Sequence, residues 1–156
     1  MLKKRVLLVE DSSTVRKIIS YYLIRLGLNV IEANDGLEAI EKIHSEKPDL
    51  VLLDITIPKL SGYAVCQQIK SDPQIKHIPI IFCTSKNYEN DYYEAIKYGA
   101  DGYLSKPFQY SEIFAMMTEL GINKLRINEY KYTPTLKEGC IRLIVPTHKN
   151  YINQFA

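Results

Sequence analysis

The chain has 156 residues, of which 46% are hydrophobic and 24% are charged, so its length and composition are typical of one globular domain and leave no room for two full domains. Its formal net charge of +2 is too small to indicate nucleic-acid binding across the whole surface. The three cysteines are odd in number and lack CxxC spacing, so the sequence indicates neither a zinc site nor a disulfide framework.

Five segments are predicted strands. Continuous apolar runs at 5–9, 50–53 and 79–83 are typical of strands that are covered on both faces, while the shorter, more polar runs at 29–33 and 101–104 suit positions nearer the sheet edges. The first run has only four apolar residues before two acids, which is too short for a signal peptide or a membrane span. We therefore expect a cytoplasmic protein without membrane association.

Helical patterns separate these strands. The first follows the capping candidates Ser12 and Ser13, and later patterns begin near 35, 62, 88 and 110 and stop before Pro48, Pro73, Gly99 and Gly121. Helical spacing assigns Ile18 to the apolar stripe of the first helix and Leu37 to that of the second. The alternation predicts a doubly wound α/β fold, with a parallel sheet, right-handed crossovers and helices on both faces.

Polar residues follow the ends of four predicted strands: Glu10 and Asp11, then Asp54, Thr84 and Lys106. Because the carboxyl ends of parallel strands lie at one sheet edge, where such folds bind ligands, we expect these side chains to form one site. Three crowded carboxylates repel each other, and Mg²⁺, which prefers oxygen ligands, relieves that repulsion. An ammonium and a hydroxyl could hold phosphoryl oxygens, so the site is predicted to transfer a phosphoryl group to Asp54.

The ordered motifs resemble the receiver domain of two-component response regulators. The matching segments are VLLVEDS at 6–12, LLDITIP at 52–58 with Gly62 four residues beyond the proline, the pair at 84–85, and YLSKPF at 103–108. The resemblance covers residues 1–121 as a receiver domain and leaves 122–156 as a C-terminal extension that is not a full effector domain. It implies a flavodoxin-like, five-stranded parallel sheet in the order 2-1-3-4-5.

The resemblance also implies which residues hold the metal. Asp11 and Asp54 would bind Mg²⁺ directly, the backbone carbonyl of Thr56 would be the third protein ligand, and Glu10 would act through water. The phosphoacceptor would be Asp54, and the donor would be a histidine kinase or a phosphotransfer protein.

The remaining implied roles concern the phosphoryl group and the signal. Thr84 would hydrogen-bond a phosphoryl oxygen, Lys106 would pair with it, and Tyr103 would be the rotating aromatic side chain. The signal would reach a downstream protein through the face made by the fourth helix, the fifth strand and the fifth helix.

Pro107 suggests a cis bond to Lys106. Tyrosines at 88, 92, 93 and 98 are either core residues or part of a partner surface.

The preferred function is a phosphorylation-controlled signalling switch that catalyses only its own phosphorylation and dephosphorylation. One rival is a Mg²⁺-dependent phosphohydrolase with an aspartyl nucleophile, but its expected second acid is replaced by Thr56. Another rival is a pseudo-receiver that acts only as a scaffold. Taken alone, Glu10 and Asp11 could be a solvated turn, Thr84 a helix cap, and Tyr103 a core residue.

The final 35 residues break the alternating pattern. Residues 122–156 contain six lysines and arginines against two glutamates, which gives a net charge of +4, and one strand candidate at 140–145. A lone strand is not stable by itself, so it adds to the receiver, pairs with another chain in a homodimer, or stays mobile. We expect a solvated or loosely docked extension rather than a DNA-binding element.

Overall fold

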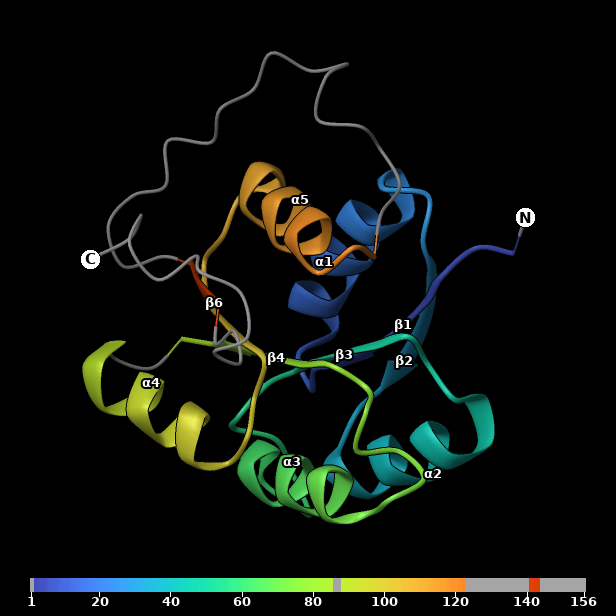
Figure 1. Cartoon of the computed structure of the whole chain (residues 1–156). Coiled ribbons are helices and arrows are strands. Elements are labelled where there is room, and N and C mark those ends of the chain that lie inside the picture. The colour runs from blue at the N-terminus through green and yellow to red at the C-terminus, as the bar shows by residue number, and fades with distance from the viewer. Residues whose placement is uncertain (1, 86–87, 123–140, 144–156) are drawn as a thin grey trace.

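The computed structural model is a sheet covered by helices on both faces (Figure 1). The structure describes residues 2–85, 88–122 and 141–143. The strands are β1 (Arg5–Val9), β2 (Asn29–Ala33), β3 (Leu50–Leu53), β4 (Ile80–Thr84), β5 (Gly102–Ser105) and β6 (Ile141–Leu143). The helices are α1 (Ser13–Arg25), α2 (Gly36–Glu46), α3 (Gly62–Ser71), α4 (Tyr88–Lys97) and α5 (Tyr110–Glu119).

The sheet has the order β2-β1-β3-β4-β5-β6, and its first five strands are parallel. This confirms the predicted doubly wound fold and its strand order. The five predicted parallel strands are present, and β6, from the strand candidate in the tail, joins β5 in antiparallel orientation, with Gly102 opposite Leu143 and Leu104 opposite Ile141. A bare β5 edge would leave backbone donors and acceptors unpaired, and β6 supplies partners for them. The strand β5 is therefore second from the lateral edge of the sheet.

Of the alternatives for the tail strand, the structure has the one in which it adds to the receiver. The rest of the C-terminal extension beyond Ile122 lies outside the described residues. Whether the extension also pairs with a second chain stays a prediction.

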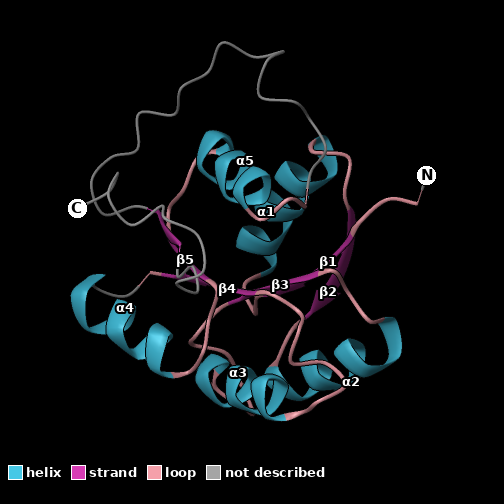
Figure 2. Cartoon of the chain, viewed as in Figure 1, coloured by secondary structure: helices cyan, strands magenta, loops and turns pink. Residues whose placement is uncertain are grey.

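Two helical layers cover the sheet, with α1 and α5 on one face and α2, α3 and α4 on the other (Figure 2). Each layer buries an apolar core against the central strands. The Ser12 hydroxyl caps α1 by accepting from the Val15 N–H, and the Asp35 carboxylate caps α2 by accepting from the Leu37 and Glu38 N–H groups. Both capped helices begin just after the carboxyl ends of their strands, and the candidate site lies at this end of the sheet.

Two assignments to the buried stripes were wrong. Ile18 is 49% exposed and Leu37 is 54% exposed. The other members of each stripe fare better: Ile19 and Leu23 are buried on α1, and Ile43 is buried on α2 together with Ala39. The helical period predicts a broad apolar stripe, but it does not determine which residues at the border of that stripe are buried against the sheet.

The tyrosines of the α4 region divide between the two predicted environments. Tyr93 is 70% exposed, whereas Tyr98 is half-buried and stacks on Tyr63 with ring centroids 4.8 Å apart. The side chains at 88 and 92 lie outside the described set. In the described part of the chain, none of the helices combines the length and apolarity that a membrane span requires.

Candidate functional site

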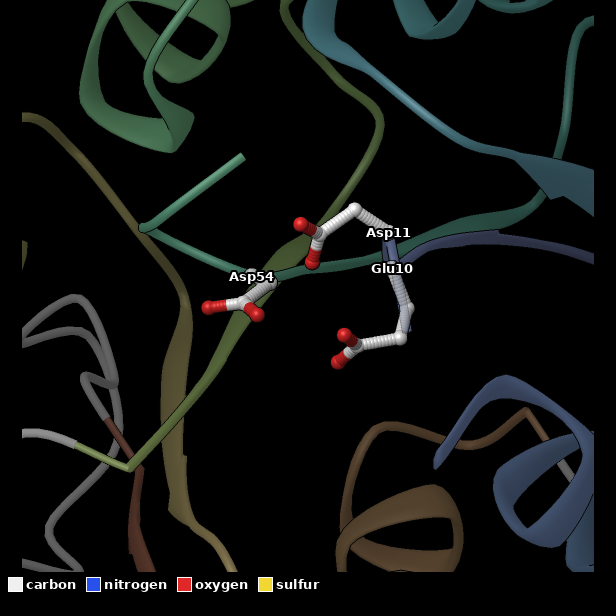
Figure 3. Close-up of side chains that lie close together, drawn as sticks. All are labelled: Glu10, Asp11 and Asp54. Carbon is white, nitrogen blue, oxygen red and sulfur yellow. The ribbon is translucent and has the colours of Figure 1, made fainter. Parts of the chain in front are cut away.

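The acidic part of the site lies at the carboxyl ends of β1 and β3. Glu10 and Asp11 follow β1, Asp54 follows β3, and these strands are paired so that Val9 lies opposite Leu53. The Asp54 N–H donates to the Val9 carbonyl at 3.0 Å, which continues the ladder into the site. Oxygens of the three carboxylates lie within 4.8 Å of one another, and Figure 3 shows the carboxylates around a common space. The predicted cluster is therefore present.

Lys106 brings a cation from the end of β5 to this cluster. Its Nζ lies 2.6 Å from Glu10 Oε2 and 2.9 Å from Asp54 Oδ2, and its side chain is only 14% exposed. Its backbone N–H donates to the Thr84 carbonyl at 2.8 Å. The Lys106–Pro107 peptide bond is cis, as the sequence suggested. One ammonium thus pairs with two buried carboxylates from two other strands.

The charges of this group do not balance. Glu10 and Asp54 are buried, Asp11 is exposed, and three carboxylates face one ammonium. Burial raises the pKa of Glu10, and the hydrogen bonds from Lys106 and Ser12 offset that effect only in part. Burial lowers the pKa of Lys106, but its bonds to Glu10 and Asp54 outweigh burial and leave that pKa raised. Lys106 is therefore charged at neutral pH, and the site keeps excess negative charge.

The hydroxyl and the aromatic candidate are both buried but lie in different parts of the molecule. Thr84 ends β4, which is between β3 and β5, so it lies at the same sheet edge as Asp54 and Lys106 and is 1% exposed. Tyr103 is also 1% exposed, but it belongs to the core on the side of the sheet that α2, α3 and α4 cover. The Thr56 side chain is exposed, while its N–H donates to Asp54 Oδ1 at 3.2 Å.

The donor set fits a divalent cation. Oxygen ligands are what Mg²⁺ prefers, and carboxylates from neighbouring strands converge here without a competing sulfur or imidazole donor among the described residues that form the cluster. Lys106 neutralises only part of the negative charge. Glu10, Asp11 and Asp54 supply the carboxylate oxygens that fit such an ion.

Two further residues support the site: Arg16, which sequence reasoning missed, and Gly62, which it named only as part of a motif. Arg16, in the first turn of α1, donates from Nη1 to the Glu10 carbonyl oxygen at 2.8 Å. Gly62 packs against the chain at Asp54 and Ile55, and a Cβ there would lie 2.7 Å from the Ile55 Cα. A cation at the start of a helix, where the helix dipole disfavours it, was the available signal for Arg16.

A comparison with protein-family models finds the response regulator receiver domain over residues 6–118. The chain belongs to this family. Among curated relatives, the receiver is 42% identical over 113 residues to a probable transcriptional regulator, ycf27, of Guillardia theta, a match that covers 72% of this chain and 43% of the relative. It is 40% identical over 114 residues to the alkaline phosphatase synthesis transcriptional regulatory protein PhoP of Bacillus subtilis, covering 73% and 47%. The chain thus spans about half the length of these relatives.

A solved structure is similar over nearly its whole length. It is the receiver domain of a sensor histidine kinase from Pseudomonas aeruginosa, which holds a magnesium ion coordinated in its active-site cleft. The TM-score is 0.70 at 28% identity, with 76% of this chain and 97% of that chain covered. The shared fold is consistent with the acidic cluster described above.

Proposed function

We propose that this receiver is a phosphorylation-controlled switch of a two-component system, in which Asp54 accepts a phosphoryl group from a histidine kinase or a phosphotransfer protein. The observation that carries the proposal is the contact of 2.9 Å between the buried Asp54 carboxylate and the Lys106 ammonium, within an acidic cluster at one sheet edge. Phosphoryl transfer depends mostly on positioning and charge neutralisation, and this arrangement supplies both.

In the proposed reaction an Asp54 carboxylate oxygen attacks the phosphorus of a phosphohistidine. The new O–P bond forms as the N–P bond breaks, and the electron pair of that bond leaves with the imidazole. Glu10 holds Lys106 beside the acceptor, and Lys106 and the Thr84 hydroxyl then bind phosphoryl oxygens. Asp11, Asp54 and the Thr56 carbonyl would hold Mg²⁺, with Glu10 acting through water, and such an ion would supply neutralisation of phosphoryl charge.

The output follows from movement of Thr84 toward the phosphoryl group. Tyr103 would rotate into the space that Thr84 leaves, which shifts the face of α4, β5 and α5 between two populations. A downstream protein that prefers one population reads the signal. β6 pairs with β5, a strand of this face, so Ile141–Leu143 would respond to the shift.

The relatives named as transcriptional regulators support transcription as the output of the protein. The expectation against DNA binding therefore applies to the receiver alone and not to a longer regulator. A cytoplasmic location and a homodimer, formed through the receiver face or the extension, belong to the same proposal. The receiver would catalyse only its own phosphorylation and dephosphorylation.

The test is intact-mass spectrometry after incubation with acetyl phosphate and Mg²⁺. We expect one added phosphoryl group in the wild type and in Asp49→Asn, a control at the other end of the sheet, and none in Asp54→Asn. Equal labelling of Asp54→Asn and wild type would refute the assigned acceptor. Multiple turnover on small phosphate esters would instead support the phosphohydrolase, and failure to bind Mg²⁺ would support the scaffold.

A further inference from the structure

Arg16 connects the metal-binding turn to β2. Its Nη1 donates to the Glu10 carbonyl oxygen at 2.8 Å, and its Nε donates to Glu32 Oε2 at 3.2 Å. Glu32 lies on β2, and its other carboxylate oxygen accepts from the Ser20 hydroxyl on α1 at 2.6 Å. The Arg16 side chain is 17% exposed and Ser20 is 8% exposed, whereas the Glu32 side chain is 47% exposed, so Arg16 itself is shielded from water and its Glu32 partner is partly open to it.

The position of Arg16 does not favour helix formation. It lies in the first turn of α1, where the partial positive charge of the helix dipole disfavours a cation, and that turn has no acidic residue. Its guanidinium contacts two oxygen acceptors on different elements instead. The planar guanidinium has donors in fixed directions and can bridge two such acceptors. A lysine ammonium, which is a single point charge on a flexible side chain, bridges them poorly.

The acceptor that Arg16 holds is the oxygen of the peptide unit joining Glu10 to Asp11. That unit is planar, so fixing its oxygen fixes the plane from which the Asp11 backbone continues. On the other side, the Glu10 N–H donates to the Ala33 carbonyl at 3.1 Å. The Ser12 N–H donates to Glu10 Oε1 at 3.1 Å, which completes a turn whose orientation depends on these bonds.

We infer that Arg16 is a positioning residue, which holds the Glu10–Asp11 turn in the geometry that binds the metal, and that Glu32 holds Arg16 in that role. The inference rests on the proposed function only in taking the cluster to bind Mg²⁺. The bonds of the turn itself are those given above.

Two physical effects predict opposite outcomes when Arg16 is removed. If Arg16 acted only as a nearby charge, its loss would raise the affinity for a cation, because repulsion of the metal would decrease. If Arg16 orients the turn, its loss lowers the affinity, as is usual when an outer partner of a metal ligand is removed. The sign of the change therefore separates positioning from electrostatics.

The experiment is a calorimetric Mg²⁺ titration of the full chain for wild type, Arg16→Ala, Arg16→Lys and Lys17→Ala. Lys17 is the exposed residue that follows Arg16 on α1, so Lys17→Ala removes the same charge from the same turn of the helix. We expect Mg²⁺ affinity to fall about tenfold in Arg16→Ala, nearly as much in Arg16→Lys, and not at all in Lys17→Ala. In an Arg16→Ala background, Glu32→Ala should add no further loss, because Glu32 acts through Arg16. Circular dichroism confirms that each variant is folded.

A second readout needs no metal. Exchange of the Ser12 amide hydrogen, followed by NMR in EDTA, should be faster in Arg16→Ala than in wild type and unchanged in Lys17→Ala. Unchanged Ser12 exchange in Arg16→Ala, or Mg²⁺ affinity that is equal or higher in Arg16→Ala, would overturn the positioning role. A wild type that binds no Mg²⁺ while Arg16→Ala still alters Ser12 exchange would refute the proposed function and the metal half of the inference, and would leave a role in turn geometry.

Discussion

The two ends of the parallel sheet use the same residue types in opposite ways. At the amino end, Asp49 accepts from the Arg5 N–H at 2.8 Å and from Lys4 Nζ at 3.2 Å. In the same arrangement, Asp101 accepts from the N–H of Ile80, the first residue of β4, at 2.8 Å and from the ammonium of a neighbouring lysine. Each acid directly precedes one strand and accepts a hydrogen bond from the first N–H of the strand beside it in the sheet. These carboxylates are part of the framework.

At the carboxyl end, three carboxylates cluster, and the ammonium of Lys106 contacts two of them, Glu10 and Asp54. The pKa values follow the difference: burial tends to raise the pKa of Asp49, but its hydrogen bonds outweigh burial and lower it, whereas burial prevails at Glu10 and raises its pKa. Acids and lysines are thus present at both ends. What marks the candidate site is negative charge that its own contacts leave unbalanced.

The largest expected effect is a loss of stability at the carboxyl end of the sheet, caused by crowding of its backbone. In Gly62→Ala the new Cβ would meet the Asp54 carbonyl oxygen and lie 2.7 Å from the Ile55 Cα, and backbone cannot move aside as a side chain can. We expect the free energy of unfolding, measured in urea, to fall by about 3 kcal/mol. Gly27→Ala is the control at the amino end, because its φ of +78° is strained but nothing lies within 4 Å, and it should lose only about 1 kcal/mol. Equal losses would contradict the close contact at Gly62.

A smaller effect separates stability from phosphorylation. Asp101→Ala leaves the Ile80 N–H and Lys70 without their shared acceptor, so unfolding should become easier by about 1–2 kcal/mol while labelling by acetyl phosphate is unchanged. Asp54→Asn should lose labelling with a smaller change in stability, because the amide oxygen can still accept from Lys106 and a charge that repels Glu10 is gone. The comparison fails if Asp101→Ala abolishes labelling in the folded protein.

The smallest effects concern pH in metal-free protein. The pKa of Asp49 is below its usual 3.8 in the fold, so its charged form adds stability above that pH and loses it as pH falls through the lowered value. The pKa of Glu10 is above 4.5, so its contribution is present below 4.5 and is lost as pH rises through the raised value. Urea unfolding from pH 3 to 7 should show the stability cost of Asp49→Asn growing with pH and that of Glu10→Gln shrinking. Parallel trends would be inconsistent with opposite shifts.

The strand-helix order could be predicted from the sequence because each unit contains its own capping residues and turn glycines. Ser12, Asp35, Gly27 and Gly99 lie where helices begin or end, so these limits depend on local bonds. The pairing of β6 with β5 could not be read in this way, since a single strand does not specify its neighbour. The exposure of Ile18 and Leu37 was missed because it depends on how closely each helix approaches the sheet.

The gathering of Glu10, Asp11, Asp54 and Lys106 followed from topology alone, because parallel strands end at the same edge. The contacts themselves were not predictable. Whether Lys106 reaches Glu10 as well as Asp54 depends on side-chain rotamers, and the Arg16 bond to the Glu10 carbonyl depends on the path of a turn. Residue types at strand ends therefore predict a site, while its supporting bonds need coordinates.

Calorimetric titration with Mg²⁺ tests the contrast between the two sheet ends most directly. We predict one site per chain in the wild type, the same affinity in Asp49→Asn, and a loss of more than about tenfold in Asp11→Asn, because only the second variant removes a carboxylate from the unbalanced cluster. Equal Mg²⁺ affinities of Asp11→Asn and wild type, or a matching loss in Asp49→Asn, would contradict this account.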